Sequence, residues 1–194
     1  MGQNVTTQLN SLNLTGQMLV AMPGMADPRF ARSVILICAH GPEGAMGLVI
    51  NRHYGTMHFN DLAAQLNISP ADNFSNPPVH YGGPVESTRG FVVHSTDYRR
   101  PDTLIIDDDL AVTHTVDILR AVADNRGPLQ HLMALGYAGW SAGQLETEIQ
   151  ANGWLIVPAD AALIFSTDID HKWEAAIGKL GFHPAMLSME AGHA

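Results

Sequence analysis

The sequence contains a single cysteine, Cys38, among its 194 residues. One cysteine excludes an internal disulfide and a zinc site built from several thiolates. Lone thiols are uncommon in secreted proteins, so the composition favours a reducing cytoplasm as the location. No apolar run approaches the roughly 20 residues that a membrane-spanning helix needs, and the longest covers only 34–38. The first sixteen residues lack the basic and apolar stretches of a signal peptide.

Basic residues are also scarce. Ten Lys and Arg stand against nineteen Asp and Glu, which gives a formal net charge of −9. Binding to a phosphate backbone needs clustered Lys and Arg, so we expect no direct contact with nucleic acid. Hydrophobic residues make up 46% of the chain, too many for a disordered protein. We predict a single domain over 1–194, with loose tails at about 1–13 and 188–194.

The pattern of apolar residues predicts strands joined by tight turns, with helices added later in the chain. The β-branched run 33–39 is typical of a strand buried on both faces, and a turn at 41–44 joins it to a strand at 46–51. Helix periodicity over 113–124 places Val116, Leu119 and Val122 on one face. Further strands are expected at 17–22, 79–82, 90–94, 104–106, 131–138 and 153–157, and further helices at 60–66, 141–151 and 173–180. This order indicates an α+β fold.

Residues 139–143 match G-x-S-x-G, the motif that presents a nucleophilic serine between a strand and a helix. Aspartates and histidines later in the chain would complete the order Ser–Asp–His. Ser141 and Gln144 also have the spacing of a capping box, in which the hydroxyl accepts the third backbone N–H and the glutamine reaches back. We expect Ser141 to cap the following helix.

Cys38 and His40 are two apart in a predicted strand, so we expect their side chains to share a face. A histidine beside a thiol lowers the pKa of the thiol and produces a reactive thiolate. Cys38 and His40 are therefore candidate catalytic residues of a thiol-based enzyme or redox sensor. The alternative is that Cys38 is a small buried side chain at the end of an apolar strand, as free cysteines often are.

Several further residues are candidates for contact with a ligand or partner. The run 82–84 is Gly-Gly-Pro, which forms either a tight turn or, with Arg89 behind it, a concave anion site. Arg52 and Arg89 follow predicted strands and either pair with structural carboxylates or form one binding surface. Trp140 belongs either to the core or to an exposed docking patch. The candidate binding residues are therefore Arg52, Gly82, Gly83, Arg89 and Trp140.

The ten histidines do not form a recognisable metal motif. There is no H-E-x-x-H, and Asp107–Asp109 lacks the spacing and glycine of a calcium loop. We therefore expect no metal and no cofactor.

Motif blocks in a specific order give the sequence a clear resemblance to one family. The chain resembles the YqgE/AlgH family of bacterial proteins from about Leu14 to about Phe165. One departure is His53, which stands after Asn-Arg where the family usually has proline. The blocks that carry the resemblance are 14–23, 27–35, 44–48, 51–52, 82–85, 89–91, 135–140, 143–146 and 152–155, together with His40.

The resemblance implies an α+β fold with a mixed, largely antiparallel, branched or barrel-like sheet surrounded by helices. It implies no particular reaction and supplies no catalytic residues, although one branch of the family is named as a transcriptional regulator. With no strong catalytic motif in the chain, we predict a non-enzymatic binding or regulatory protein of the cytoplasm. We expect it to act through an unidentified protein partner or small ligand, with no membrane and with self-association left open.

Overall fold

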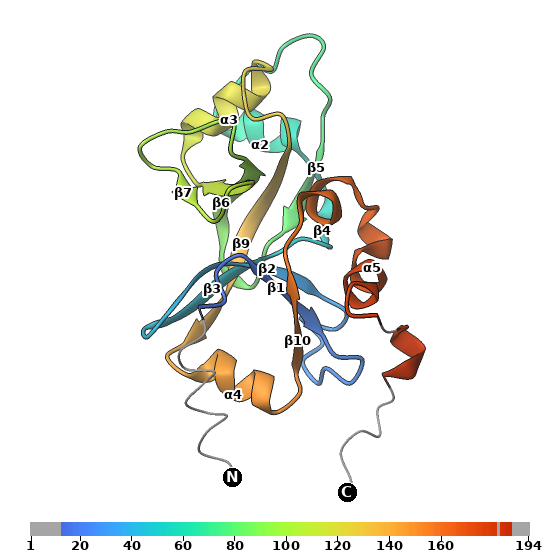
Figure 1. Ribbon diagram of the computed structural model, residues 1–194. Helices are drawn as coiled ribbons and strands as arrows, with labels where there is room; N and C mark the ends of the chain where they lie inside the picture. Colours follow the sequence, from blue (N-terminus) through green and yellow to red (C-terminus); the bar gives the residue numbers. More distant parts are fainter. Residues whose placement is uncertain (1–12, 182, 188–194) are drawn as a thin grey trace, which may run out of the picture.

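One long strand, β9 (His131–Ser141), organises the whole sheet of the computed structural model (Figure 1). The first part of β9 pairs with antiparallel β6 (Val85–Ser95) and parallel β5 (Pro78–Tyr81). Its last residues pair with antiparallel β3 (Gly44–Val49). Ten strands therefore form a branched, largely antiparallel sheet, as the family resemblance implied.

The structure describes residues 13–181 and 183–187, so the expected tails lie almost entirely outside the described residues. The strand order is β10-β1-β2-β3-β9-β6-β8-β7, with β4 joined to the other edge of β5. The strands not yet given are β1 (Gln17–Ala21), β2 (Val34–Gly41), β4 (His53–His58), β7 (Leu104–Ile105), β8 (Leu110–Thr113) and β10 (Trp154–Pro158).

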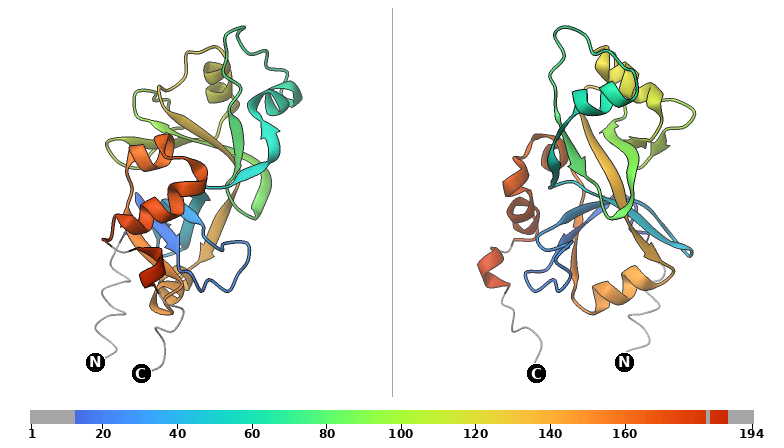
Figure 2. Two further views of the ribbon diagram at one scale, coloured as in Figure 1. Left: turned by 90° about the vertical axis from the view of Figure 1, so that its right-hand side faces the viewer. Right: turned by 180° about the vertical axis from the view of Figure 1, so that it is seen from behind.

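Helices cover the sheet on several sides (Figures 1 and 2). None among the described residues is long and apolar enough to cross a bilayer. They are α2 (Phe59–Gln65), α3 (Val116–Ala123), α4 (Gln144–Gln150) and α5 (Lys172–Gly178), with a π-helix η1 (Ala162–Ser166) and 3₁₀ turns η2 (Ile169–His171) and η3 (Pro184–Met186).

Three apolar clusters hold the helices against the sheet. One lies under α2 and α3, one lies between the sheet and α5 with η1, and one lies beside α4. Strand β2 contributes to two of them, because Leu36 packs in the cluster of α5 while Ile35 and Ile37 pack in the cluster of α4. The prediction of a strand buried on both faces is confirmed.

The sheet branches where Gly82 and Gly83 cross Gly136 of β9. A Cβ atom on Gly82 would lie 2.2 Å from the Gly136 carbonyl oxygen, and a Cβ on Gly136 would lie 2.3 Å from the Gly83 oxygen. Gly136 also has a φ of 73°, which side chains other than hydrogen disfavour. Two backbones approach here at a distance that only glycine allows.

Several elements differ from the predictions. Strands β4 and β8 were not predicted, and α3 starts at Val116 because residues 110–113 are buried as a strand. Val116 is 39% exposed, and Ile118 takes its place in the core. Strand β9 continues to Ser141, so α4 begins three residues later than expected.

The branch point gives a prediction about stability. Gly136→Ala places a Cβ atom on a backbone with positive φ and makes it clash with the Gly83 oxygen, so we expect the free energy of unfolding to fall by about 3 kcal/mol or more. Gly143→Ala is the matched control, because Gly143 has a φ of 74° but nothing within 4 Å of its Cβ position. That change should cost only about 1 kcal/mol. Urea unfolding of the two variants measures the difference, and equal losses would contradict a steric role for the crossing.

Candidate functional site

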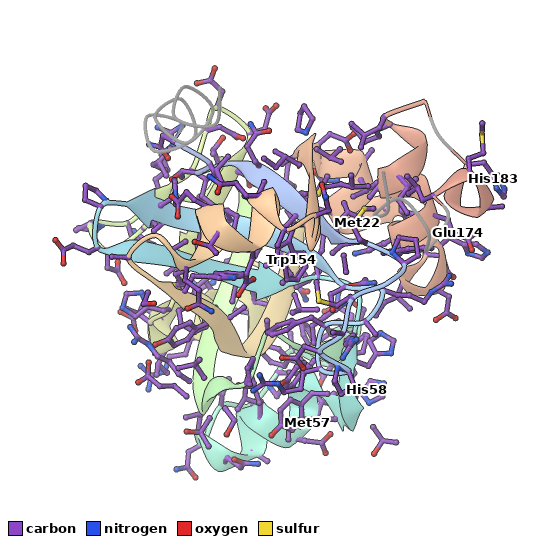
Figure 3. All side chains as sticks on the ribbon, turned by 90° about the horizontal axis from the view of Figure 1, so that it is seen from below. Met22, Met57, His58, Trp154, Glu174 and His183 are labelled. Carbon is purple, nitrogen blue, oxygen red and sulfur yellow. The ribbon has the colours of Figure 1, made fainter. Side chains whose placement is uncertain are left out.

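A cleft of about 660 Å³ lies between α4, the end of β9 and the loop 22–33. We call it the tryptophan cleft, because Trp140 and Trp154 form one wall of it and Phe30 packs edge-on against Trp154 at 5.9 Å. Met22 and Met25 add flexible apolar surface. Figure 3 shows Met22 and Trp154 close together near the middle of the molecule seen from below. Most of the surface inside the cleft is apolar.

A half-buried carboxylate, Glu148, holds the tryptophan wall in place. Its Oε2 accepts the indole N–H of Trp140 at 2.9 Å and that of Trp154 at 2.8 Å. Its Oε1 accepts from the Gln144 side chain at 2.9 Å. The rings of Trp140 and Trp154 meet edge to face at 6.1 Å, so one glutamate fixes the orientation of both.

The opposite side of the cleft is shaped by the loop 22–33, which Arg52 fastens. The Arg52 guanidinium donates to the carbonyl oxygens of Arg29 at 2.6 Å and Ala31 at 2.5 Å. Arg52 therefore holds the loop 22–33 from outside the cleft and is not one of the residues that line it. At the rim, Asp27 pairs with Arg29 at 2.7 Å, and the hydrogen bonds from Arg29 lower the pKa of the Asp27 carboxyl.

A more open groove lies on the other side of Trp140. It includes His40, Arg89 and Tyr137 along the β2–β3 turn. Arg89 pairs with Glu86 at 3.2 Å on the surface and stacks over Phe91. Three of the predicted candidates, His40, Arg89 and Trp140, thus line one groove, whereas Arg52 lies elsewhere.

His40 is fixed by contacts on both ring nitrogens. The Leu14 backbone N–H donates to Nδ1 at 3.1 Å, so the ring proton sits on Nε2 and is donated to Glu146 at 2.7 Å. The histidine side chain is only 5% exposed. Glu146 and Glu148 therefore contact different partners, since residues two apart on a helix do not share a face.

Cys38 lies away from His40 because β2 contains a bulge. Ile37 pairs with Gly47 and Ala39 with Met46, which leaves Cys38 as the extra residue. Cys38 packs in the cluster of α5, while His40 pairs with Ala45, which packs in the cluster of α4. The expectation that the two side chains share a face is wrong, since a bulge reverses the alternation.

The Cys38 thiol is buried and donates to the Leu36 carbonyl at 3.6 Å. Burial raises its pKa to about 12, the opposite of what a nucleophilic thiolate requires. This geometry offers no support for a thiol-based reaction at Cys38.

The two glycines of the 82–84 run take part in the backbone contacts that hold the sheet together. The Gly82 N–H donates to Leu135 at 2.8 Å, and its carbonyl accepts from Val49 at 2.8 Å. Gly83 lies directly against the backbone of Tyr137. The Gly82 amide is therefore already used within the sheet.

Ser141 is tied to the start of α4 through Gln144. The Gln144 Oε1 accepts from the Ser141 backbone N–H at 3.0 Å and from its hydroxyl at 3.2 Å. The glutamine half of the expected capping box is present, but the hydroxyl donates to Gln144 instead of accepting a backbone N–H. Within the described residues no histidine hydrogen-bonds to Ser141, and no group of three or more His, Cys, Asp or Glu is placed to hold a metal ion.

Sequence reasoning did not identify Glu148 as the central residue of the site. The only signal was a glutamate on a short helix flanked by two tryptophans. Its role depends on Trp140 and Trp154 from different strands meeting at the same oxygen.

The double contact of Glu148 predicts a large effect on stability. Glu148→Ala leaves the indole N–H groups of two buried tryptophans without an acceptor, so we expect a loss of about 2–4 kcal/mol. Glu174→Ala is the control, because Glu174 is an exposed residue of α5, apart from Trp154 (Figure 3), and makes only a surface pair with Arg32. It should cost less than about 0.5 kcal/mol. Thermal unfolding compares the two, and a loss for Glu148→Ala no larger than the control's would count against the shared acceptor.

The burial of Cys38 predicts its reactivity. Iodoacetamide should leave the thiol of the native protein unmodified near neutral pH and modify it fully after denaturation, because the thiolate forms only near pH 12 in the folded state. Mass spectrometry at a series of pH values measures the rate. Rapid alkylation of the folded protein near pH 7 would restore the thiol hypothesis.

Comparison with known proteins identifies the family. The AlgH-like family model matches residues 18–185. A UPF0301 protein of Rhodospirillum rubrum is 53% identical over 181 residues, covering 93% of this chain and 94% of that protein. A UPF0301 protein of Rhodopseudomonas palustris is 56% identical over 189 residues, covering 93% and 89%.

Two solved structures share the fold. The solution structure of the AlgH protein from Pseudomonas aeruginosa superimposes with a TM-score of 0.78 at 40% identity, covering 95% of this chain and 97% of that one. A crystal structure of a Corynebacterium diphtheriae protein superimposes with a TM-score of 0.71 at 21% identity, covering 91% of this chain and 92% of that one. This likeness bears on the fold alone. The family model covers most of the chain, and relatives more than half identical cover nearly all of it: this chain belongs to the AlgH-like family.

Proposed function

We propose that this protein is a non-enzymatic ligand-binding protein of the cytoplasm, and that the tryptophan cleft is its binding site. The observation that carries the proposal is the cleft of about 660 Å³ with two oriented tryptophans in its wall. This volume is in the range of small-molecule sites, which are also mostly apolar with a few placed polar groups.

The chemistry of the cleft favours one class of ligand. Its charged lining groups are Asp27, Arg29 and Glu148, and Arg29 is already paired with Asp27. The charge that remains is the negative charge of Glu148. A compact apolar ligand that is neutral or carries a cationic or hydrogen-bond-donating group fits this surface better than an anion.

A regulatory role through such a ligand, or through a partner that senses it, agrees with the family resemblance, since one branch of the family is named as a transcriptional regulator. Direct binding to DNA is not favoured, because five of the eight arginines already pair with carboxylates. These are Arg29, Arg32, Arg89, Arg120 and Arg126.

A matched pair of fluorescent probes tests the proposal. N-phenyl-1-naphthylamine is neutral, and 8-anilinonaphthalene-1-sulfonate adds a sulfonate to the same skeleton. We expect saturable fluorescence enhancement with the neutral probe and weaker binding of the sulfonate, which Glu148 repels.

Gly24→Phe should block the cleft, since Gly24 lines it and has nothing within 4 Å of its Cβ position. We expect it to weaken binding of the neutral probe about tenfold or more. Gly178→Phe is the control, because Gly178 is also exposed and open but lies on α5. Equal affinity of the two variants for the neutral probe would contradict the proposal. So would the absence of saturable probe binding by the unmodified protein.

A further inference from the structure

A second, smaller cavity of about 280 Å³ lies between β4 and β5, the start of β9, η1 and α5. It shares no lining residue with the tryptophan cleft. Its titratable lining groups are all basic, and no Asp or Glu lines it, although the chain carries a net charge of −9. We call it the basic cavity, and its basic residues are His53, His80, His131 and Lys172.

Lys172 is a buried cation without a carboxylate partner. It is only 3% exposed, and its Nζ donates to the backbone carbonyls of Ile50, at 3.1 Å, and Ile164. Within the described residues, no carboxylate is within salt-bridge distance and the third N–H has no acceptor. Burying an ammonium group costs free energy unless an opposite charge pairs with it, so an anion bound in the cavity would stabilise this arrangement.

The two carbonyl contacts account for two of the N–H groups of Lys172. A free amine would satisfy both carbonyls as well, but only the ammonium has a third N–H to donate. With a pKa of about 8, the ammonium is the main form near neutral pH, so Lys172 has a donor left for an anion.

Two histidines in the cavity have unused ring nitrogens. The Nδ1 atoms of His80 and His131 are buried and have no hydrogen-bond partner of good geometry in the described part of the chain, although the backbone of Met133 acts on His80 and that of Pro128 on His131. The His80 ring also lies 5.3 Å from the ring of His53, centroid to centroid. Buried polar atoms normally have partners, so two orphaned nitrogens beside an unpaired ammonium point to a ligand.

The backbone beside the cavity is also unusual. The Thr167 N–H donates to the Ala162 carbonyl at 3.0 Å, five residues back, which makes η1 a π-helix. Such turns are rare and occur often at functional sites. This one presents the Ile164 carbonyl to Lys172 and so helps to position the ammonium in the cavity wall.

We propose that the basic cavity binds a small oxyanion, a carboxylate or phosphate group of a low-molecular-weight compound. The oxyanion would accept the third N–H of Lys172 and charge-assisted hydrogen bonds from protonated His80 and His131. The volume is at the small end of ligand sites, so the ligand is compact. A metal ion fits less well, because Lys172 contributes a positive charge.

The pKa values of the basic groups agree with an anion site in the cavity. Burial lowers the pKa of Lys172 to about 8, and burial and then the charge of Lys172 lower the pKa of His80 to about 4. Burial also lowers the pKa of His131. A bound anion stabilises the protonated forms and raises these values, so binding takes up protons and tightens as the pH falls. The charged or titratable groups that act on Lys172 and His80 are His53 and Asp168, the residue that caps the start of η2.

The chain has only two lysines, Lys172 and Lys179, which makes the test direct. Protein labelled with ¹³C,¹⁵N-lysine is titrated by NMR with sodium phosphate, sodium sulfate and sodium acetate, each against sodium chloride at the same ionic strength. We expect at least one oxyanion to shift the side-chain signals of Lys172 saturably, more tightly at lower pH, with Lys179 unchanged. Saturation by acetate identifies a carboxylate site, and saturation by phosphate or sulfate identifies a phosphate site.

Two variants complete the test. K172M should lower the affinity for the oxyanion about tenfold or more. K179M loses only a surface pair with Asp160 and should bind the oxyanion as tightly as the unmodified protein. If K172M does not fold, H131Q and the titration of the unmodified protein decide. Shifts that never saturate, equal shifts of both lysines, unchanged affinity in a folded K172M, or saturable binding of Zn²⁺ with no response to any oxyanion would overturn the proposal.

Discussion

The close backbone contact of Gly82 and Gly83 with Gly136 is the constraint on which the rest of the structure depends. It lets β9 leave β5 and continue beside β3, so one strand belongs to two parts of the sheet. The ends of that strand then reach different sites. His131, at the start, lines the basic cavity, and Trp140, near the end, forms the wall of the tryptophan cleft.

Both sites hold an ionised side chain with neutral dipoles. The Glu148 carboxylate is surrounded by two indole N–H groups and an amide, and the Lys172 ammonium by two carbonyls. Neither charge is cancelled by an opposite charge. On the surface the pattern is reversed, since most arginines pair with nearby carboxylates. Each hollow therefore holds a charge with no counter-charge beside it, and the two charges differ in sign, which is why the two proposals call for ligands of opposite kinds.

Strong local patterns predicted much of the fold from the sequence, and long-range pairing accounts for what they missed. The β-branched residues of β2 indicate a strand, but the bulge at Cys38 depends on the register with β3, which no local pattern shows. Glu148 becomes central only when strands bring Trp140 and Trp154 together. Lys172 looks like the solvent-facing start of a helix, and its burial follows from the packing of α5 against the carbonyl of Ile50.

The burial of Cys38 in β2 has a consequence for how the protein behaves in air. Because the only thiol of the chain packs in the interior beside Leu36, two folded copies present no thiol to each other. We therefore expect exposure to oxygen to create no disulfide-linked dimer of the native protein. Any association between folded copies, with or without reductant, must come from their surfaces alone.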